Sequence, residues 1–344
     1  MHDLMFDKPT FYNEDCIEGS RRHIPDGVID LIITDPPYGI QGDKLHRHYN
    51  RKEEFVVDGY VEVPAEDYAE FSRCWITEAD RILRPGGSIY IVSGYTNLIH
   101  VLNALRETNL KEVNHIIWKY NFGVHTTRKY ISSHYHILYY TKPGKSSSFN
   151  TYCRFGANER SDDNGSLNYK DREDVWIINR EYKPGKIKNK NELPSSLIMK
   201  MIQYSSNEND IVFDMFLGGF STARIAYGMN RRVGGFEVSM TAFEHGMQEM
   251  APIEKGELLR NIRMPESGVP KRQGLSWAHG EKEQISSRYK DLSASGLTKK
   301  KVMEILSKEF ERGYWSLEKM LKTQMPSRRI KKIQHATLFD DSQK

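Results

Sequence analysis

Short apolar runs alternate with helix-like segments through much of the chain, and this alternation limits the fold more than any other feature. Between the runs, apolar residues recur at helical spacing, as Tyr68, Phe71 and Trp75 do before the break at Pro85. Strands that alternate with helices favour a parallel sheet with both faces covered. The sequence therefore predicts an α/β fold, with strands at 30–34, 88–94, 113–120, 132–144 and 231–237, helices at 66–84, 95–110 and 193–206, and a strand, a glycine turn and a helix over 210–230.

The composition is that of a folded protein in water. Of the 344 residues, 38% are hydrophobic and 28% are charged, and no apolar stretch approaches the roughly 18 to 20 residues that cross a bilayer. The first ten residues lack the basic and apolar regions of a signal peptide. Cys16, Cys74 and Cys153 are odd in number and far apart, which is typical of reduced thiols. We therefore expect a cytoplasmic protein without membrane contact.

Two segments, 141–192 and 251–280, lose the alternating pattern, and a helical module follows them. Residues 141–192 are rich in Lys, Ser, Asn, Asp and Gly, and they predict a loop-rich insertion on which target recognition is built. Residues 251–280 have little periodicity and predict a linker. The expected organisation is a catalytic domain at 1–250, which contains the insertion, then the linker, then a small basic helical module at 281–344.

The C-terminal part of the chain carries most of the positive charge. Residues 270–344 hold 17 Lys and Arg against 9 Asp and Glu, an excess of eight, whereas the whole chain has a net charge of +4. This excess favours a nucleic-acid partner, although a solvated lysine-rich surface explains it as well. Helices are expected at about 281–293, 298–310, 316–324 and 327–333, with Thr298 and Ser316 as N-caps. Two of these short helices are expected to form a helix-turn-helix-like arrangement.

Six basic residues are expected to contact DNA phosphates. Arg128 and Lys129 lie in the loop after the strand at 113–120, where an ordinary charged surface is an equal alternative. In the basic module the expected contacts are Lys299, Lys300, Arg328 and Arg329.

The stretch Asp35-Pro36-Pro37-Tyr38 follows the first strand, and its two prolines end any sheet ladder and stiffen the backbone. The Asp35 carboxylate and the Pro36 carbonyl can each accept one hydrogen of a planar amino group, and Tyr38 offers a ring for stacking. The alternative is a strand-ending turn whose aspartate caps a backbone donor. The stretch favours a cradle for the amino group of an extruded base.

A second motif lies in the strand, turn and helix around Asp214, with Gly218 and Gly219 in the turn. Glycines let the backbone approach a ligand, and a helix N-terminus beyond a strand is a usual cradle for an adenosine-containing group. Glu237 ends the next strand and can accept hydrogen bonds from ribose hydroxyls. Taken alone, such a turn is more often plain chain geometry.

Together, the two motifs resemble the S-adenosylmethionine-dependent amino-methyltransferases of DNA, which make N6-methyladenine or N4-methylcytosine. The order, with Asp-Pro-Pro-Tyr before the glycine turn, is similar to the β class, and the resemblance covers about residues 10–245. It implies a Rossmann-like, mostly parallel seven-stranded sheet. It also implies catalytic roles for Asp35, Pro36, Pro37 and Tyr38, and cofactor contacts from Asp15, Thr34, Asp35, Asp214, Phe216, Gly218, Gly219 and Glu237.

The chain departs from the family pattern in three ways. Phe220 replaces the last glycine of the cofactor turn, which moves a side chain toward the cofactor or reflects a shifted turn. Leu193-Pro194 stands where the family has Lys-Pro, so one contact to the cofactor's carboxylate is missing. The basic C-terminal module lies outside the family's core pattern.

The resemblance implies a cytoplasmic enzyme of a bacterium, an archaeon or a phage that methylates adenine N6 in double-stranded DNA after base flipping. Alternatives are N4-cytosine methylation, a DNA-binding regulator whose methyltransferase body has lost turnover, and methylation of RNA or of a protein glutamine. S-adenosylmethionine is the expected cofactor. The resemblance allows a homodimer and a restriction endonuclease partner. His134 and His136 lack a third ligand at suitable spacing, so no metal site is expected.

Overall fold

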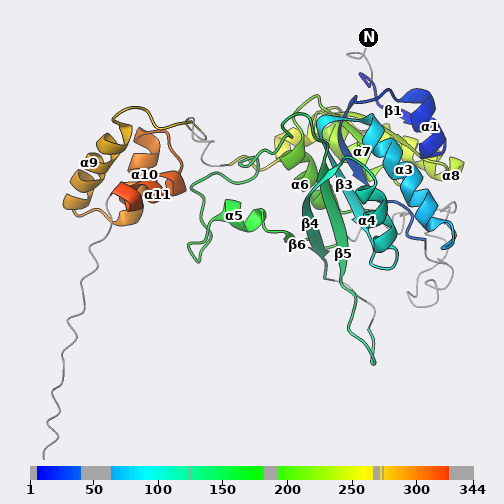
Figure 1. Cartoon of the computed structure of the whole chain (residues 1–344), viewed down its shortest axis with the longest axis horizontal. Helices are drawn as coiled ribbons and strands as arrows, with labels where there is room; N and C mark the ends of the chain where they lie inside the picture. Colours follow the sequence, from blue (N-terminus) through cyan, green and yellow to red (C-terminus); the bar gives the residue numbers. More distant parts are fainter. Residues whose placement is uncertain are drawn as a thin grey trace, which may run out of the picture. The chain divides into compact units, whose positions relative to one another are not determined.

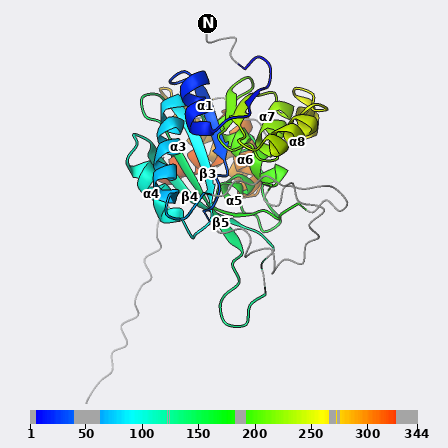
Figure 2. The same cartoon turned by 90° about the vertical axis from the view of Figure 1, so that its right-hand side faces the viewer.

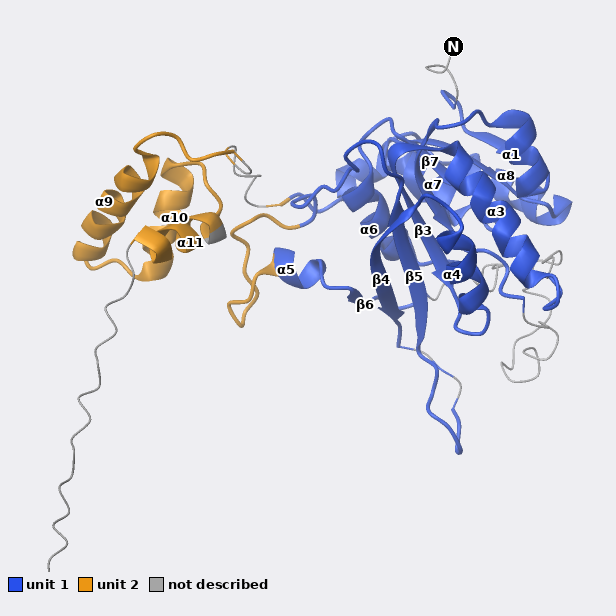
Figure 3. Ribbon diagram, in the orientation of Figure 1, with its two compact units in different colours: residues 1–154, 168–264 blue, residues 155–167, 265–344 orange. Residues whose placement is uncertain are grey.

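The computed structural model describes residues 6–39, 63–121, 123, 125–181, 192–265, 272 and 275–324. The chain forms two compact units, coloured separately in Figure 3. The first consists of Met1–Arg154 and Asn168–Met264, and the second of Phe155–Leu167 and Pro265–Lys344.

The first unit is built on a sheet that has eight strands in the described part of the chain, in the order β1-β8-β7-β2-β3-β5-β4-β6. Only β5 runs antiparallel to its neighbours, β3 and β4, and the remaining pairs are parallel. The strands are β1 (Thr10–Tyr12), β2 (Ile29–Thr34), β3 (Leu83–Ser93), β4 (Lys111–Lys119), β5 (His134–Thr141), β6 (Val175–Ile177), β7 (Ile211–Asp214) and β8 (Arg232–Phe236).

Helices cover both faces of this sheet (Figures 1 and 2). One face packs against α1 (Cys16–His23), α3 (Tyr68–Ile82) and α4 (Leu98–Arg106). The other packs against α6 (Ser195–Ser205), α7 (Ser221–Gly228) and α8 (Met240–Met250). Two short elements, α5 (Leu167–Asp171) and the 3-10 helix η3 (Glu257–Asn261), complete the described elements outside the second unit.

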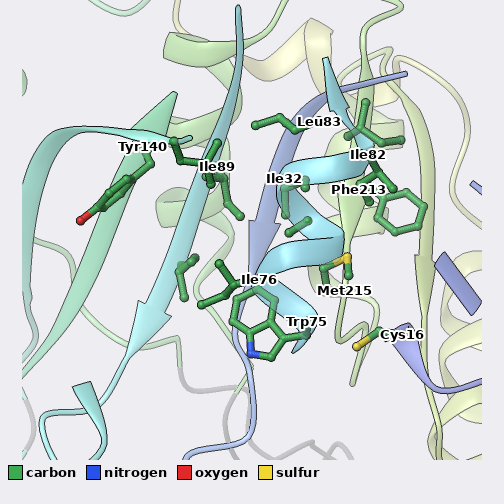
Figure 4. Close-up of a cluster of buried hydrophobic side chains, with 14 of the residues drawn as sticks. Cys16, Ile32, Trp75, Ile76, Ile82, Leu83, Ile89, Tyr140, Phe213 and Met215 are labelled. Atoms are coloured by element: carbon green, nitrogen blue, oxygen red, sulfur yellow. The ribbon is translucent and has the colours of Figure 1, made fainter. Parts of the chain in front are cut away.

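The core on the first face shows why the apolar pattern of α3 produces this packing. Trp75, Ile76 and Ile82 recur at helical spacing and are completely buried. They meet Ile32 of β2 and Phe213 of β7 in the cluster drawn in Figure 4. Since central parallel strands are covered on both sides, β2 has three consecutive apolar residues, Leu31 to Ile33, instead of an alternating pattern.

The α/β prediction with a mostly parallel sheet is confirmed, and each long strand and helix predicted in the first unit is present, with ends that differ by a few residues. The resemblance implies seven strands, and this count is wrong for the described residues. The six strands predicted from the apolar pattern are joined by β1 and β6, which gives eight. Both have only three residues, too few to show a period. Helices α1 and α8 were not predicted either.

The insertion at 141–192 contains α5 and β6 and is anchored to α6 by a buried polar network. Asp171 accepts hydrogen bonds from the Tyr204 hydroxyl at 2.6 Å and from Arg154 Nε at 2.9 Å. The Lys200 ammonium lies 3.6 Å from the same carboxylate and 4.4 Å above the Trp176 ring. Two cations therefore share one carboxylate beneath the insertion.

The second unit holds α9 (Glu281–Ala294), α10 (Lys299–Glu309) and α11 (Tyr314–Gln324) around a small apolar core. These helices confirm three of the predicted ones, whereas the one expected at 327–333 lies outside the described residues. Thr298 is the N-cap of α10, but Ser316 is not an N-cap because α11 begins two residues earlier. Across the described residues, every helix is too short or too polar to cross a membrane.

Phe220, which stands where the family has glycine, is the N-terminal cap of α7 and adopts the left-handed conformation, with φ of 59° and ψ of 20°. Its side chain is completely buried, and its ring centroid lies 4.8 Å from that of Phe11 and 5.8 Å from that of Phe243. Gly246 of α8 makes room for it, since a Cβ there would lie 2.0 Å from the Phe220 ring. A glycine on α8 thus accommodates the bulky residue in the turn.

We expect Gly246→Ala to destabilise the protein even though alanine is the better helix former. Overpacking a buried site costs about 1–3 kcal/mol, which exceeds the ~1 kcal/mol that the exchange gains in a helix. Urea unfolding measures the change. Gln248→Ala, at an exposed position of the same helix, should change the unfolding free energy by less than about 0.5 kcal/mol. Adding Phe220→Ala to Gly246→Ala should cost less than the sum of the two single changes, and strict additivity would contradict the contact.

Candidate active site

A pocket of about 280 Å³ lies at the carboxyl ends of β2, β7 and β8. Neighbouring parallel strands end at one edge of a sheet, so the loops that follow them meet there. Thr34 is buried beside the pocket. The other residues predicted to be catalytic or to bind the cofactor line it: Asp15, Asp35, Pro36, Pro37, Tyr38, Asp214, Phe216, Gly218, Gly219 and Glu237.

Hydrogen bonds fix the glycine turn between β7 and α7. Buried Asp214 accepts hydrogen bonds from Thr34 Oγ1 at 2.9 Å and from the Phe216 N–H at 3.1 Å. Glu237 Oε2 accepts one from the Gly218 N–H at 2.8 Å. Gly218 has a φ of 51°, in the left-handed region that glycine adopts without strain. The turn and the two acids at its sides therefore form one rigid wall of the pocket.

The loop after β2 is held as firmly. The Tyr38 hydroxyl donates to Asp35 Oδ1 at 2.5 Å, and the Tyr68 hydroxyl donates to the Pro37 carbonyl at 2.7 Å. Asn97 Nδ2 donates to the Tyr38 carbonyl at 2.6 Å. These bonds occupy the carbonyls of Pro37 and Tyr38, and Asp35 and Pro36 line the pocket. Their acceptor groups are thus set in place before any ligand arrives.

Several carboxyl groups line this pocket, and burial raises the pKa of three of them. Burial raises the pKa of Asp35 to about 7; the Tyr38 hydroxyl and the Arg180 charge oppose the rise, and Asp214 adds to it. Burial also raises the pKa of Asp214 to about 7, despite hydrogen bonds to its carboxylate. The pKa of Glu237 is raised by burial as well. A pocket with this much negative charge suits a ligand that carries a positive charge.

Three further predictions concern the walls of the pocket. Asp15 caps α1, where its Oδ1 accepts hydrogen bonds from the Ile17 N–H at 2.9 Å and the Glu18 N–H at 3.2 Å. Leu193 lines the pocket, so an apolar side chain occupies the place where the family has lysine. Phe220 does not line it, which answers the question raised by that substitution. A larger turn residue is therefore compatible with an open pocket.

Several residues that support the site gave no signal in the sequence. Asn97, the N-cap residue of α4, and Tyr68 of α3 hold the loop after β2, although they lie about 60 and 30 positions away along the chain. Phe71 and Glu192 line the pocket without belonging to either motif. Contacts between distant segments leave no local pattern, so periodicity and short motifs could not reveal them.

The structure describes four of the six residues that are predicted to contact DNA. Arg128 and Lys129 are exposed in the loop between β4 and β5. In the second unit, Lys299 Nζ lies 2.7 Å from the Glu318 carboxylate, whereas Lys300 is exposed at the N-terminal end of α10. Arg328 and Arg329 lie outside the described residues. Contact with DNA stays a prediction for all of them.

Comparison with known proteins gives three kinds of match. A family model of N6/N4 methyltransferases, described as DNA methylase, matches residues 29–248. The chain is similar to the Type II methyltransferase M.HpaI of Haemophilus parainfluenzae, with 29% identity over 238 residues, 67% of this chain and 70% of that protein. It is also similar to the Type II methyltransferase M.BamHI of Bacillus amyloliquefaciens, with 30% identity over 248 residues, 67% of this chain and 55% of that protein.

Among solved structures, TTHA0409 from Thermus thermophilus, complexed with S-adenosyl-L-methionine, shares the fold with a TM-score of 0.51 and 19% identity. The likeness covers 75% of this chain and 97% of that one.

We expect Asp35→Asn to stabilise the fold at pH 8 but not at pH 4.5. The native Asp35 pKa of about 7 lies above the unfolded value of about 3.9, so the native state binds more protons between these values and loses stability as pH rises. Asparagine keeps the acceptor for Tyr38 and removes this penalty, a gain of about 1–3 kcal/mol at pH 8. Urea titrations at both pH values measure it, with exposed Asp7→Asn as control. Equal gains at both pH values would contradict the raised pKa.

Proposed function

The chain belongs to the N6/N4 DNA methylase family, and from this membership we propose that it transfers a methyl group from S-adenosylmethionine to the N6 amino group of adenine in double-stranded DNA. The observation that carries the proposal is the single pocket that holds both motifs. Asp35 and Pro36 line it from one strand end, and Gly218 and Glu237 line it from two others. A methyltransferase of this kind needs its cofactor and its target amino group side by side.

The residues of the pocket fit S-adenosylmethionine. Glu237 accepts one backbone hydrogen bond at each oxygen, from Ser239 and Gly218, and a carboxylate retains acceptor sites beyond these for ribose hydroxyls. Phe216 and Leu217 form an apolar part of the pocket wall. Asp35 and Asp214 place negative charge where a sulfonium is stabilised. When bound, the cofactor supplies a methyl group activated by its positively charged sulfur.

The chain's own residues orient the acceptor nitrogen. In the proposed complex, the base leaves the helix and its amino group donates one hydrogen to the Asp35 carboxylate and the other to the Pro36 carbonyl. This arrangement favours a tetrahedral nitrogen, whose lone pair is no longer delocalised into the ring. As the nitrogen acquires its methyl group it becomes acidic, and Asp35, with a pKa of about 7, accepts the released proton.

Adenine is proposed as the target because aspartate, and not serine, precedes Pro36-Pro37-Tyr38, a feature that leans toward adenine within the family. Cytosine N4 remains the alternative, since the matched family model spans both reactions. The rival idea of a regulator without turnover is suggested by Phe220 and by the helix-turn-helix-like C-terminal module. Phe220 packs against Gly246 of α8 and does not line the pocket, so it gives this idea no support.

We expect Asp35→Ala to reduce methyl transfer at least 1000-fold, because it removes the hydrogen-bond acceptor and the proton acceptor together, effects worth about 10²–10⁴-fold for the proton transfer alone. Cofactor binding, measured by calorimetry, should change little. The assay uses labelled cofactor and defined duplexes, followed by sequencing for modified bases. Exposed Asp7→Ala serves as control. Turnover retained by Asp35→Ala would refute the mechanism, and labelled cytosine would replace adenine with the N4 alternative.

DNA contact by the exposed basic residues is part of the same proposal. Each phosphate contact that is lost should lower the slope of log affinity against log salt concentration by about 1. We expect this change for Arg128→Ala and for Lys300→Ala, measured by fluorescence anisotropy with a labelled duplex. Lys8→Ala, at an exposed position outside the predicted contacts, is the control. Slopes unchanged from the wild-type value would assign both side chains to the solvated surface.

A further inference from the structure

Arg180 has an unusual environment beside the active-site loop. Its guanidinium carbon lies 4.9 Å from the ring centroid of Tyr120, 5.3 Å from that of Tyr135 and 5.7 Å from that of Trp118. The three rings also contact one another, with centroids 5.6 to 5.7 Å apart. An arginine held on several aromatic faces is fixed in position by cation–π attraction and by stacking.

Two backbone anchors bring Arg180 to this place. The edge strand β6 pairs in parallel with β4, and just beyond it the Ile178 N–H donates to the Lys119 carbonyl at 3.0 Å. The indole N–H of Trp118 donates to the Ile178 carbonyl at 2.8 Å. Arg180 follows two residues later, so the last part of the insertion delivers this side chain to the rings.

The aromatic cluster continues directly into the active-site loop. Tyr135 stacks on Tyr38 with ring centroids 5.5 Å apart and an angle of 22° between the planes. Tyr38 in turn donates its hydroxyl hydrogen to Asp35. A rigid chain of contacts therefore joins Arg180 to the carboxylate that accepts the amino hydrogens in the proposed mechanism.

The charge of Arg180 is not used by an ion pair with any residue that the structure describes. Within the described ranges, no carboxylate lies within 4.0 Å of its guanidinium, and its Nε is buried without a hydrogen-bond partner. Arg224, by contrast, pairs with both Glu192 and Glu249 near the same pocket. A cation without a carboxylate partner, in a setting of low polarity, acts over a longer range on the nearest anion.

We propose that Arg180 is a positioning residue of the methyl-transfer site, whose guanidinium, seated on the aromatic cluster, favours the ionised form of Asp35, which accepts the amino hydrogens. The inference rests on the proposed function for its catalytic meaning. Asp214 from β7 raises the pKa of Asp35, while Tyr38 and Arg180 lower it. Among the described residues, Tyr135 also interacts with Asp35, and Arg180 opposes the rise that burial causes in the pKa of this tyrosine.

The first test measures Asp35 directly and needs no turnover. In the full chain labelled at aspartate Cγ, the Asp35 carboxyl is assigned by its loss in Asp35→Asn and titrated by NMR. Arg180→Met should raise the midpoint by roughly 0.5–1 pH unit, as expected for loss of a nearby opposite charge. Arg180→Lys keeps the charge and should stay close to the wild-type midpoint. Arg172→Met, at an exposed arginine of the same segment, should not move it.

The second test is the pH profile of single-turnover methyl transfer. For Arg180→Met the acid limb should shift in the same direction, so the rate falls roughly 3–10-fold at pH 6.5 and recovers toward the wild-type rate at pH 9. Arg180→Lys should restore the profile. An equal loss at every pH, or an unchanged Asp35 midpoint, would overturn the proposal and leave Arg180 a packing residue.

The two tests separate the possible failures. If the wild-type protein methylates no duplex, the proposed function fails, but the Asp35 titration still decides whether Arg180 acts on this carboxyl. If the wild-type protein is active and the midpoint does not move, only the role of Arg180 fails. Arg180→Gln is made alongside, and if neither it nor Arg180→Met folds at 25 °C, the residue is structural and the proposal is overturned.

Discussion

The buried hydrogen bond from Thr34 Oγ1 to Asp214 Oδ1 joins two strand ends that are 180 residues apart in the sequence. Thr34 leads directly into the Asp35 loop, and Asp214 leads into the glycine turn. Because β2 and β7 are neighbouring parallel strands, their carboxyl ends lie at the same edge, and this bond fixes one against the other. This bond therefore helps to fix the Asp35 loop, the proposed amino-group cradle, relative to the glycine turn.

The same convergence concentrates negative charge. Asp35, Asp214 and Glu237 line one pocket, and burial raises the pKa of each. Such a group of acids lowers the stability of the folded chain at neutral pH, a pattern that is common where function and stability compete. A positively charged ligand stabilises the ionised forms of these buried acids, so binding and folding are linked at this site. Close packing also supports the glycine turn, since Gly246 on α8 leaves room for the Phe220 side chain at its end.

Much of this organisation could be predicted from the sequence, and the rest could not for physical reasons. Consecutive apolar residues predicted β2 and β3, and apolar residues at helical spacing predicted α3. Both patterns can be recognised without knowledge of the tertiary contacts. Strands of three residues, such as β1 and β6, show no period. Asp35 and Glu237 were found through local motifs. The bonds from Tyr68 and Asn97 to the Asp35 loop join separate helices to it, and the sequence carries no sign of such contacts.

Arg180 illustrates the limit most clearly, since a lone arginine near the end of a polar insertion has no distinguishing pattern. Its importance comes from β6, which extends the sheet by one short strand and turns the following residues toward Tyr120 and Tyr135. If Arg180 acts as proposed, the segment expected to select the DNA target also sets the charge state of Asp35. Substitutions that shift β6 against β4 would then change the rate of methyl transfer, because the pairing of these strands places Arg180 on the aromatic rings.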